Sequence, residues 1–213
     1  MFCHACGQGH QHPKLKLRVL VEDLVESLIE LDSRVFRTVW GMTVRPGDVV
    51  RDYLDGRRIV YINPFKYALV AVTLAFVVLP WVGTALGLED GTKTADGFEW
   101  QKLLNLMALP LTATTMFIVF IRRGRSWVEH LVIVLFALGH TFVLQTILGS
   151  LFMLVAPQWS AVMTIIPIAW LAWSARKSLD VHWAWALAGA VLSFGGVLLL
   201  VPWLKSLIAP ATG

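Results

Sequence analysis

Apolar and polar positions are arranged differently before and after Asn63. Between residues 15 and 40, leucines recur at the i, i+3, i+4 spacing of one helix face, and acidic side chains occupy the opposite face. This pattern predicts an amphipathic helix over residues 15–40. Beyond Asn63, five apolar stretches come close to the roughly 20 residues that cross a bilayer. They cover residues 64–86, 103–121, 131–155, 159–175 and 183–204.

Short motifs mark where helices begin and end ahead of the first apolar stretch. Pro46 suits the first position of a helix, where no backbone N–H is needed, and Gly56 suits the left-handed position that follows a helix end. Asn63 followed by Pro64 places a capping side chain before a proline at the first helical position. These signals predict one helix that starts at Pro46 and stops at Gly56, and another that starts at Pro64.

Composition then sets the class of protein. Of the 213 residues, 57% are hydrophobic and 15% are charged, and the mean hydropathy is +0.67. Soluble domains usually carry about a quarter charged residues, and disorder requires low hydrophobicity, so this composition excludes both an ordinary soluble core and disorder for most of the chain. The predicted fold class is all-α: a polytopic helical membrane protein with five transmembrane helices and a small N-terminal cytoplasmic head.

The positions of lysine and arginine predict an orientation. With five crossings and the N-terminus inside, the cytoplasmic segments 1–66, 122–130 and 175–182 hold ten, three and two Lys/Arg, against three in the outside segments. This sorting favours membrane orientation over nucleic-acid binding as the reason for the net charge of +4. The chain divides into a knuckle (1–13), a cytoplasmic helix and linker (14–63) and a transmembrane domain (64–213).

The strongest chemical signal lies at the start of the chain. Cys3 and Cys6 are three residues apart and precede a glycine, which is the spacing with which two thiolates bind one tetrahedral Zn²⁺. His10 and His12 are the nearest candidates to complete four ligands. The hypothesis is a structural zinc site of Cys3, Cys6, His10 and His12. The alternative is a disordered tail with incidental ligands, and a catalytic zinc is disfavoured because no carboxylate is positioned beside the motif.

Two further groups of residues are candidates for binding. The basic linker next to the first span predicts a lipid-headgroup or partner site made of Arg45, Tyr53, Arg57, Arg58, Tyr61 and Lys66. The alternative is positive-inside anchoring, which any such protein needs. Within the third span, His140 and Gln145 are intramembrane polar residues. Such residues are functional candidates, although a neutral histidine bonded to a neighbouring helix is the simpler explanation.

Several segments resemble one family of bacterial membrane proteins. These are CHACGQ at 3–8, LDSRVFRT at 31–38 and RPGDVVRDYLDGRRIVYINPFKY at 45–67. The chain is similar to the family catalogued as domain of unknown function 3667, which has a zinc-ribbon head, a T…RPG…YLxGxR…NP linker and several spans. The family's ribbon carries two CxxCG knuckles, and this chain carries one. The resemblance implies a bacterial inner (plasma) membrane protein and implies no activity. The Lys/Arg distribution predicts a cytoplasmic N-terminus and a periplasmic C-terminus.

The function predicted first is that of a non-enzymatic membrane module. Its head would bind zinc, and the leucine-lined residues 17–31 would contact membrane lipids, a protein partner or a second copy. The alternatives are a small transporter or channel with a path through the third and fifth spans, and a membrane-embedded enzyme that modifies lipid. Against transport, no span carries Asp, Glu, Lys or Arg deep inside it.

Overall fold

The computed structural model describes residues 33–85, 109–155 and 165–197, and the regular elements within these ranges are helical. Ahead of the first span lie α2 (Ser33–Val44), α3 (Pro46–Leu54) and the 3₁₀ turn η1 (Arg58–Val60). The apolar helices are α4 (Pro64–Ala85), a helix over Leu109–Val119, α6 (Trp127–Val155), α7 (Ile165–Ser178) and α8 (Trp183–Ala190). A 3₁₀ turn, η2 (Ile121–Arg123), precedes α6, and a π-helical turn, η4 (Val191–Gly195), follows α8.

The start and stop signals in the linker are confirmed. Pro46 opens α3, and Gly56 follows the end of that helix with a left-handed φ of 106°. Asn63 caps α4, because its Oδ1 accepts hydrogen bonds from the backbone N–H groups of Phe65 at 2.9 Å and Lys66 at 3.4 Å. The predicted helix over 15–40 is helical where the structure describes it, but it extends to Val44.

Two of the five predicted spans are long and apolar enough to cross a membrane: the helical segments Arg58–Ala85 and Trp127–Phe152, with mean hydropathies of 2.1 and 2.2. The other three predicted spans extend beyond the described residues. Their described parts are the helix Leu109–Val119, α7 and α8 with η4. Five crossings therefore remain a prediction. The third span begins at Trp127 rather than at residue 131.

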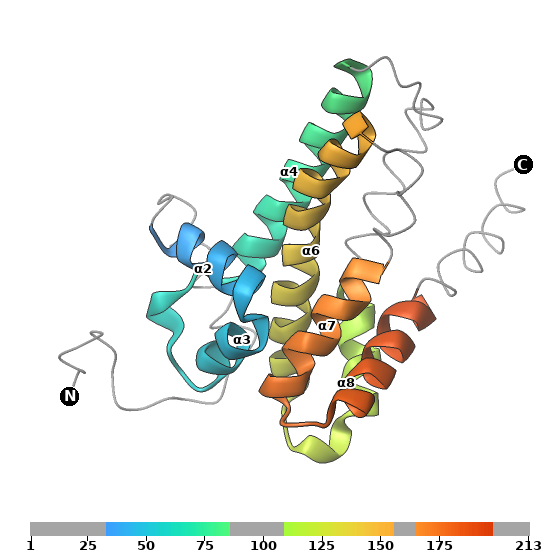
Figure 1. Ribbon diagram of the computed structural model, residues 1–213. Helices are drawn as coiled ribbons and strands as arrows, with labels where there is room; N and C mark the ends of the chain where they lie inside the picture. The colour runs from blue at the N-terminus through green and yellow to red at the C-terminus, as the bar shows by residue number, and fades with distance from the viewer. Residues whose placement is uncertain (1–32, 86–108, 156–164, 198–213) are drawn as a thin grey trace, which may run out of the picture.

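Helices α4 and α6 lie side by side and run parallel (Figure 1). A Cβ atom on Gly139 would lie 3.0 Å from the Cα of Ala68, and one on Gly149 would lie 3.2 Å from Leu79. Both contacts pair residues about 70 positions apart in the sequence, so the two helices run in the same direction and stay in contact along their length. Small residues at such a contact let backbones approach closely, which is how helices associate in lipid.

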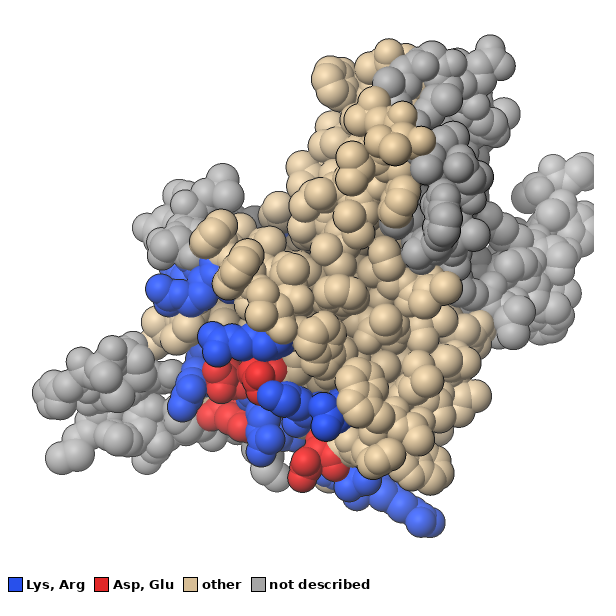
Figure 2. All heavy atoms as spheres, in the orientation of Figure 1, with Lys and Arg blue, Asp and Glu red and all other residues tan. Residues whose placement is uncertain are grey.

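Charged residues gather at one end of the molecule (Figure 2). This polar end comprises residues 45–58, 121–129 and 176–180, and its parts are joined by ion pairs between α3 and the ends of the bundle. The apolar helices are free of Asp, Glu, Lys and Arg over residues 67–85, 109–121, 130–155 and 181–197. The three basic segments that the sequence assigns to one side of a membrane thus contribute to a common end of the described structure.

Candidate functional site

The most polar point inside the bundle is His140, in the middle of α6. Its side chain is fully buried. The Nδ1 atom lies 2.6 Å from the hydroxyl of Tyr67 on α4, and Nε2 lies 3.2 Å from Oγ1 of Thr43 on α2. The ring stacks on Tyr67 and lies 5.9 Å, between centroids, from the ring of Trp170 on α7. His140 therefore joins four helices.

The direction of these hydrogen bonds follows from Thr43. Its hydroxyl donates to the carbonyl of Val39 at 2.8 Å, so it has no second proton to give and must accept from His140 Nε2–H. With the proton on Nε2, the Nδ1 atom is an acceptor, and the Tyr67 hydroxyl donates to it. The series of hydrogen bonds from Tyr67 through His140 to Thr43 thus uses both ring nitrogens of a neutral histidine. It therefore acts as a hydrogen-bonded link between α4, α6 and α2.

Two more hydrogen bonds hold α2 in place. Trp170 donates its indole N–H to the carbonyl of Met42 at 2.9 Å, which pairs one of the last carbonyls of α2. One turn earlier along the helix, the backbone N–H of Ile62 donates to Oγ1 of Thr38 at 3.1 Å. The first bond fixes α2 to α7, and the second fixes it to the linker that enters α4.

Ion pairs at the polar end form a second connection. Lys177, at the end of α7, lies 2.6 Å from Asp48 Oδ1 on α3. Arg125 pairs with Asp55 at 3.3 Å and with Glu129 at 3.0 Å. Burial tends to lower the pKa of Arg125, but hydrogen bonds to Glu129 and Asp55 outweigh burial and raise that pKa above its ordinary value. The guanidinium therefore stays charged and bridges α3 to the start of α6.

Glu129 also completes a capping box at the start of α6. Its carboxylate accepts the backbone N–H of Ser126 at 2.7 Å, and the Ser126 hydroxyl accepts the backbone N–H of Glu129 at 3.3 Å. This reciprocal cap explains why α6 begins at Trp127, ahead of the predicted boundary. The spacing Ser126-x-x-Glu129 is readable in the sequence, and it was the signal that the sequence analysis missed.

The linker residues predicted to bind lipid or a partner do not form one surface. Arg45 and Arg57 are exposed, and Arg58 is half-buried. Tyr61 is buried, and its hydroxyl donates to Asp52 at 3.1 Å. Lys66 is buried as well. The assignment of Tyr53 needs correction, because its side chain is only 1% exposed and packs edge-on against Phe136, where no headgroup can reach it.

The remaining predicted site residues are placed as follows. Gln145 is half-buried on α6, five residues after His140. Cys3, Cys6, His10 and His12 lie outside the described residues, as do residues 17–31. Within residues 33–85, 109–155 and 165–197, no group of three or more His, Cys, Asp or Glu side chains is arranged to hold a metal. The zinc hypothesis thus stays a prediction about the N-terminal segment.

Residues 32–76 match the model of the family described as Protein of unknown function (DUF3667), which confirms the resemblance of the linker and leaves that of residues 3–8 a prediction. No curated protein and no solved structure matches the chain. The matched segment contains α2, α3, η1 and the first half of α4, and so includes Thr43 and Tyr67. Their shared partner His140 lies outside it, as does Trp170, which bonds to the carbonyl of Met42. The matched segment is therefore joined by hydrogen bonds to the later helices α6 and α7.

Proposed function

We propose that this chain is an integral protein of the bacterial inner membrane that acts as a non-enzymatic binding module. In this proposal, the part of the family segment before α4 is a cytoplasmic head fixed to a bundle of membrane helices, and the residues before it bind zinc and contact a partner or lipid. The observation that carries the proposal is the meeting of three basic segments at one polar end, with apolar helices free of charge beyond it.

The dimensions of α6 support a membrane position. Its 29 residues correspond to about 43 Å, which is enough to cross the roughly 30 Å hydrocarbon core and to extend through the headgroup layer on one side. Since Ala68 lies beside Gly139, Pro64 is level with about residue 135, so α4 begins about 12 Å above the start of α6. Helix α3 fills that lower layer. It would lie at headgroup depth, with its charged side chains toward water.

Helix α2 carries an exposed apolar face at the level where α4 begins. Phe36, Trp40 and Val44 follow one another at i, i+4 spacing and are 75%, 63% and 51% exposed. Arg37 is exposed beside them. A helix that presents Trp and Phe beside arginine suits the boundary between headgroups and acyl chains. This face supports contact between the head and membrane lipids.

The packing of His140 supports a structural role for this residue rather than a proton path. Both ring nitrogens are hydrogen-bonded, and the ring lies against those of Tyr67 and Trp170. A transport pathway needs a polar group that can face water or an ion in at least one state. The non-enzymatic module is accordingly preferred to the transporter.

Cysteine labelling tests the orientation. In a background where Cys3 and Cys6 are serine, His182→Cys reports on the exposed turn before α8, and Lys93→Cys reports on the segment after the first span. We expect a membrane-impermeant maleimide to label Lys93→Cys in intact spheroplasts, and His182→Cys only after permeabilisation. Labelling of His182→Cys in intact spheroplasts would overturn the proposed orientation.

Metal analysis tests the zinc part separately. We expect the purified protein to contain about one zinc per chain, because a structural site binds one tetrahedral ion. Cys3→Ser should lose that zinc, whereas Ser33→Ala, a similarly small substitution outside the motif, should retain it. Zinc at the same trace level in the wild type and in Cys3→Ser would refute the zinc site without affecting the membrane proposal.

A further inference from the structure

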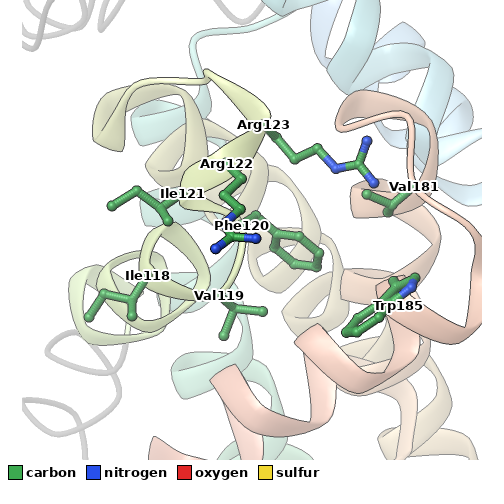
Figure 3. A pocket seen from close by; sticks show the side chains of 8 residues that line it. All are labelled: Ile118, Val119, Phe120, Ile121, Arg122, Arg123, Val181 and Trp185. Carbon is green, nitrogen blue, oxygen red and sulfur yellow. The ribbon is translucent and has the colours of Figure 1, made fainter.

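A hollow opens at the polar end, between the end of the helix Leu109–Val119 and the start of α8. Its volume is about 520 Å³. Val119 and Phe120 form part of one wall, and Trp185 stands on the opposite side (Figure 3). Two adjacent arginines of η2, Arg122 and Arg123, line the hollow, and Arg123 extends toward the α8 side. The hollow thus combines an apolar wall with two cations.

These arginines differ from the four ion-paired cations at the polar end. Lys177, Arg125, Arg57 and Arg51 each have a carboxylate within 4.0 Å. Among the residues that the structure describes, Arg122 and Arg123 form no ion pair, and both are exposed. Their charge is therefore available to an anion from outside the chain.

The wall of the hollow is built by a close contact. Phe120 is only 5% exposed, and it packs where α8 has Gly189. A Cβ atom on Gly189 would lie 2.3 Å from Cζ of Phe120, so a larger residue would displace the ring. The hollow is thus bounded by the contact between two helices and by the turn that follows one of them.

We propose that this hollow binds an anionic phospholipid, with its phosphate between Arg122 and Arg123 and one acyl chain along Val119 and Trp185. Guanidinium groups bind phosphate oxygens in charge-assisted, often bidentate hydrogen bonds. The arginines directly follow an apolar helix, so they lie at headgroup depth, where the cytoplasmic leaflet is anionic. This inference rests on the proposed membrane orientation, which the labelling experiment tests independently.

Retention of defined lipids tests the site. The purified protein, in neutral detergent, is mixed with phosphatidylglycerol or phosphatidylcholine, and bound lipid is counted by native mass spectrometry. We expect one phosphatidylglycerol per chain to be retained in preference to phosphatidylcholine. Arg122→Gln combined with Arg123→Gln should weaken its binding about thirtyfold, as expected for two cations at a lipid surface.

A matched variant distinguishes a specific lipid site from general electrostatic attraction between the protein and anionic lipid. Arg51→Gln combined with Lys177→Gln removes the same charge from two exposed cations outside the hollow, and it should change lipid binding less than about twofold, since no pocket is lost. Two variants of uncharged residues test the apolar wall of the hollow. Trp185→Ala should weaken binding, whereas Trp81→Ala, at a similarly exposed tryptophan of α4, should not.

The outcomes decide the proposal. Equal loss in the Arg122/Arg123 variant and in the Arg51/Lys177 variant, or equal retention of the two lipids, would reduce the hollow to ordinary electrostatic anchoring and overturn the site. Inorganic phosphate is the third probe. If it binds as tightly as phosphatidylglycerol in neutral detergent, the ligand is a soluble phosphate and the lipid assignment is wrong. If the arginine pair does not fold, the tryptophan pair still gives the answer.

Discussion

Two junctions hold the family segment, residues 32–76, on the later helices, and they differ in chemistry. The inner junction is the chain from Tyr67 through His140 to Thr43, with a ring nitrogen that has no access to water. The outer junction is made of ion pairs, and Lys177 and Asp48 remain 43% and 39% exposed. Water can replace a partner lost at the outer junction, but not one lost at the buried bond between Tyr67 and His140.

This difference predicts unequal energies for bonds of similar length. A buried donor or acceptor left without a partner costs about 1–3 kcal/mol, whereas exposed ion pairs contribute about 0–1 kcal/mol. The number of charges at the polar end is therefore a poor guide to what fixes the head. We expect one histidine to matter more to the stability of docking than several salt bridges.

The largest effect is expected for His140→Leu. The variant leaves the Tyr67 hydroxyl buried without an acceptor and removes the link to Thr43, which should lower the free energy of unfolding by about 2 kcal/mol. Unfolding in detergent, followed by tryptophan fluorescence, measures the change. A loss no greater than that of the outer-junction variants would contradict the proposed difference between the junctions.

A double variant sharpens this prediction. Tyr67→Phe alone removes the donor and leaves His140 Nδ1 unpaired. In His140→Leu combined with Tyr67→Phe, neither group remains unpaired at that bond, so the double variant should be more stable than the sum of the single losses predicts. Strict additivity would show that the 2.6 Å hydrogen bond between the two side chains does not contribute to docking.

The next effect concerns the end of α2. Trp170→Phe keeps an aromatic ring beside His140 but removes the donor to the Met42 carbonyl, and it should cost about 1 kcal/mol. Trp173→Phe is the matched control, because this neighbouring tryptophan contacts Trp170 and has no indole hydrogen bond within the described residues. Equal losses in both variants would assign the effect to ring packing.

Sequence predicted the parts of the head that depend on local chemistry. Pro46, Gly56 and Asn63 with Pro64 were identified correctly, because a cap or a helix end is decided by neighbouring residues. His140 was identified as unusual because a polar side chain stands out in an apolar helix. Its partners were not, since Tyr67 and Thr43 lie 73 and 97 residues away and periodicity within a helix does not give the register between helices.

Tyr53 shows a different kind of error. The segment around it is rich in arginine and aspartate, and this composition favoured a surface role. In α3, however, Val49, Val50, Tyr53 and Leu54 share the buried face, and the charged residues lie outside. The i, i+3, i+4 spacing predicts that burial. Helical periodicity was thus the better guide in a charged segment than its composition.

Within the outer junction, Arg125 should have the larger effect. It is 28% exposed and reaches both Glu129 and Asp55, so Arg125→Gln should cost about 1 kcal/mol. Arg37→Gln removes an exposed arginine that has no ion pair within the described residues, and it should change the stability of the protein in detergent little. If the two variants were equally stable, the bridge from α3 to α6 would contribute nothing to docking.

The smallest effect is expected for Lys177→Met. Methionine keeps the apolar stem of the side chain. This stem packs closely on α3, since a Cβ atom on Gly47 would lie 2.7 Å from the Cβ of Lys177. The variant therefore removes only the charge that faces Asp48. The loss should be about 0.5 kcal/mol at low salt, and it should vanish near 1 M salt, where the screening length is about 3 Å. His140→Leu serves as the reference, because salt screens buried hydrogen bonds far less. Should the Lys177→Met loss persist in high salt, the pair would be acting through packing, and the contrast between a solvated outer junction and a dry inner one would fail at this contact.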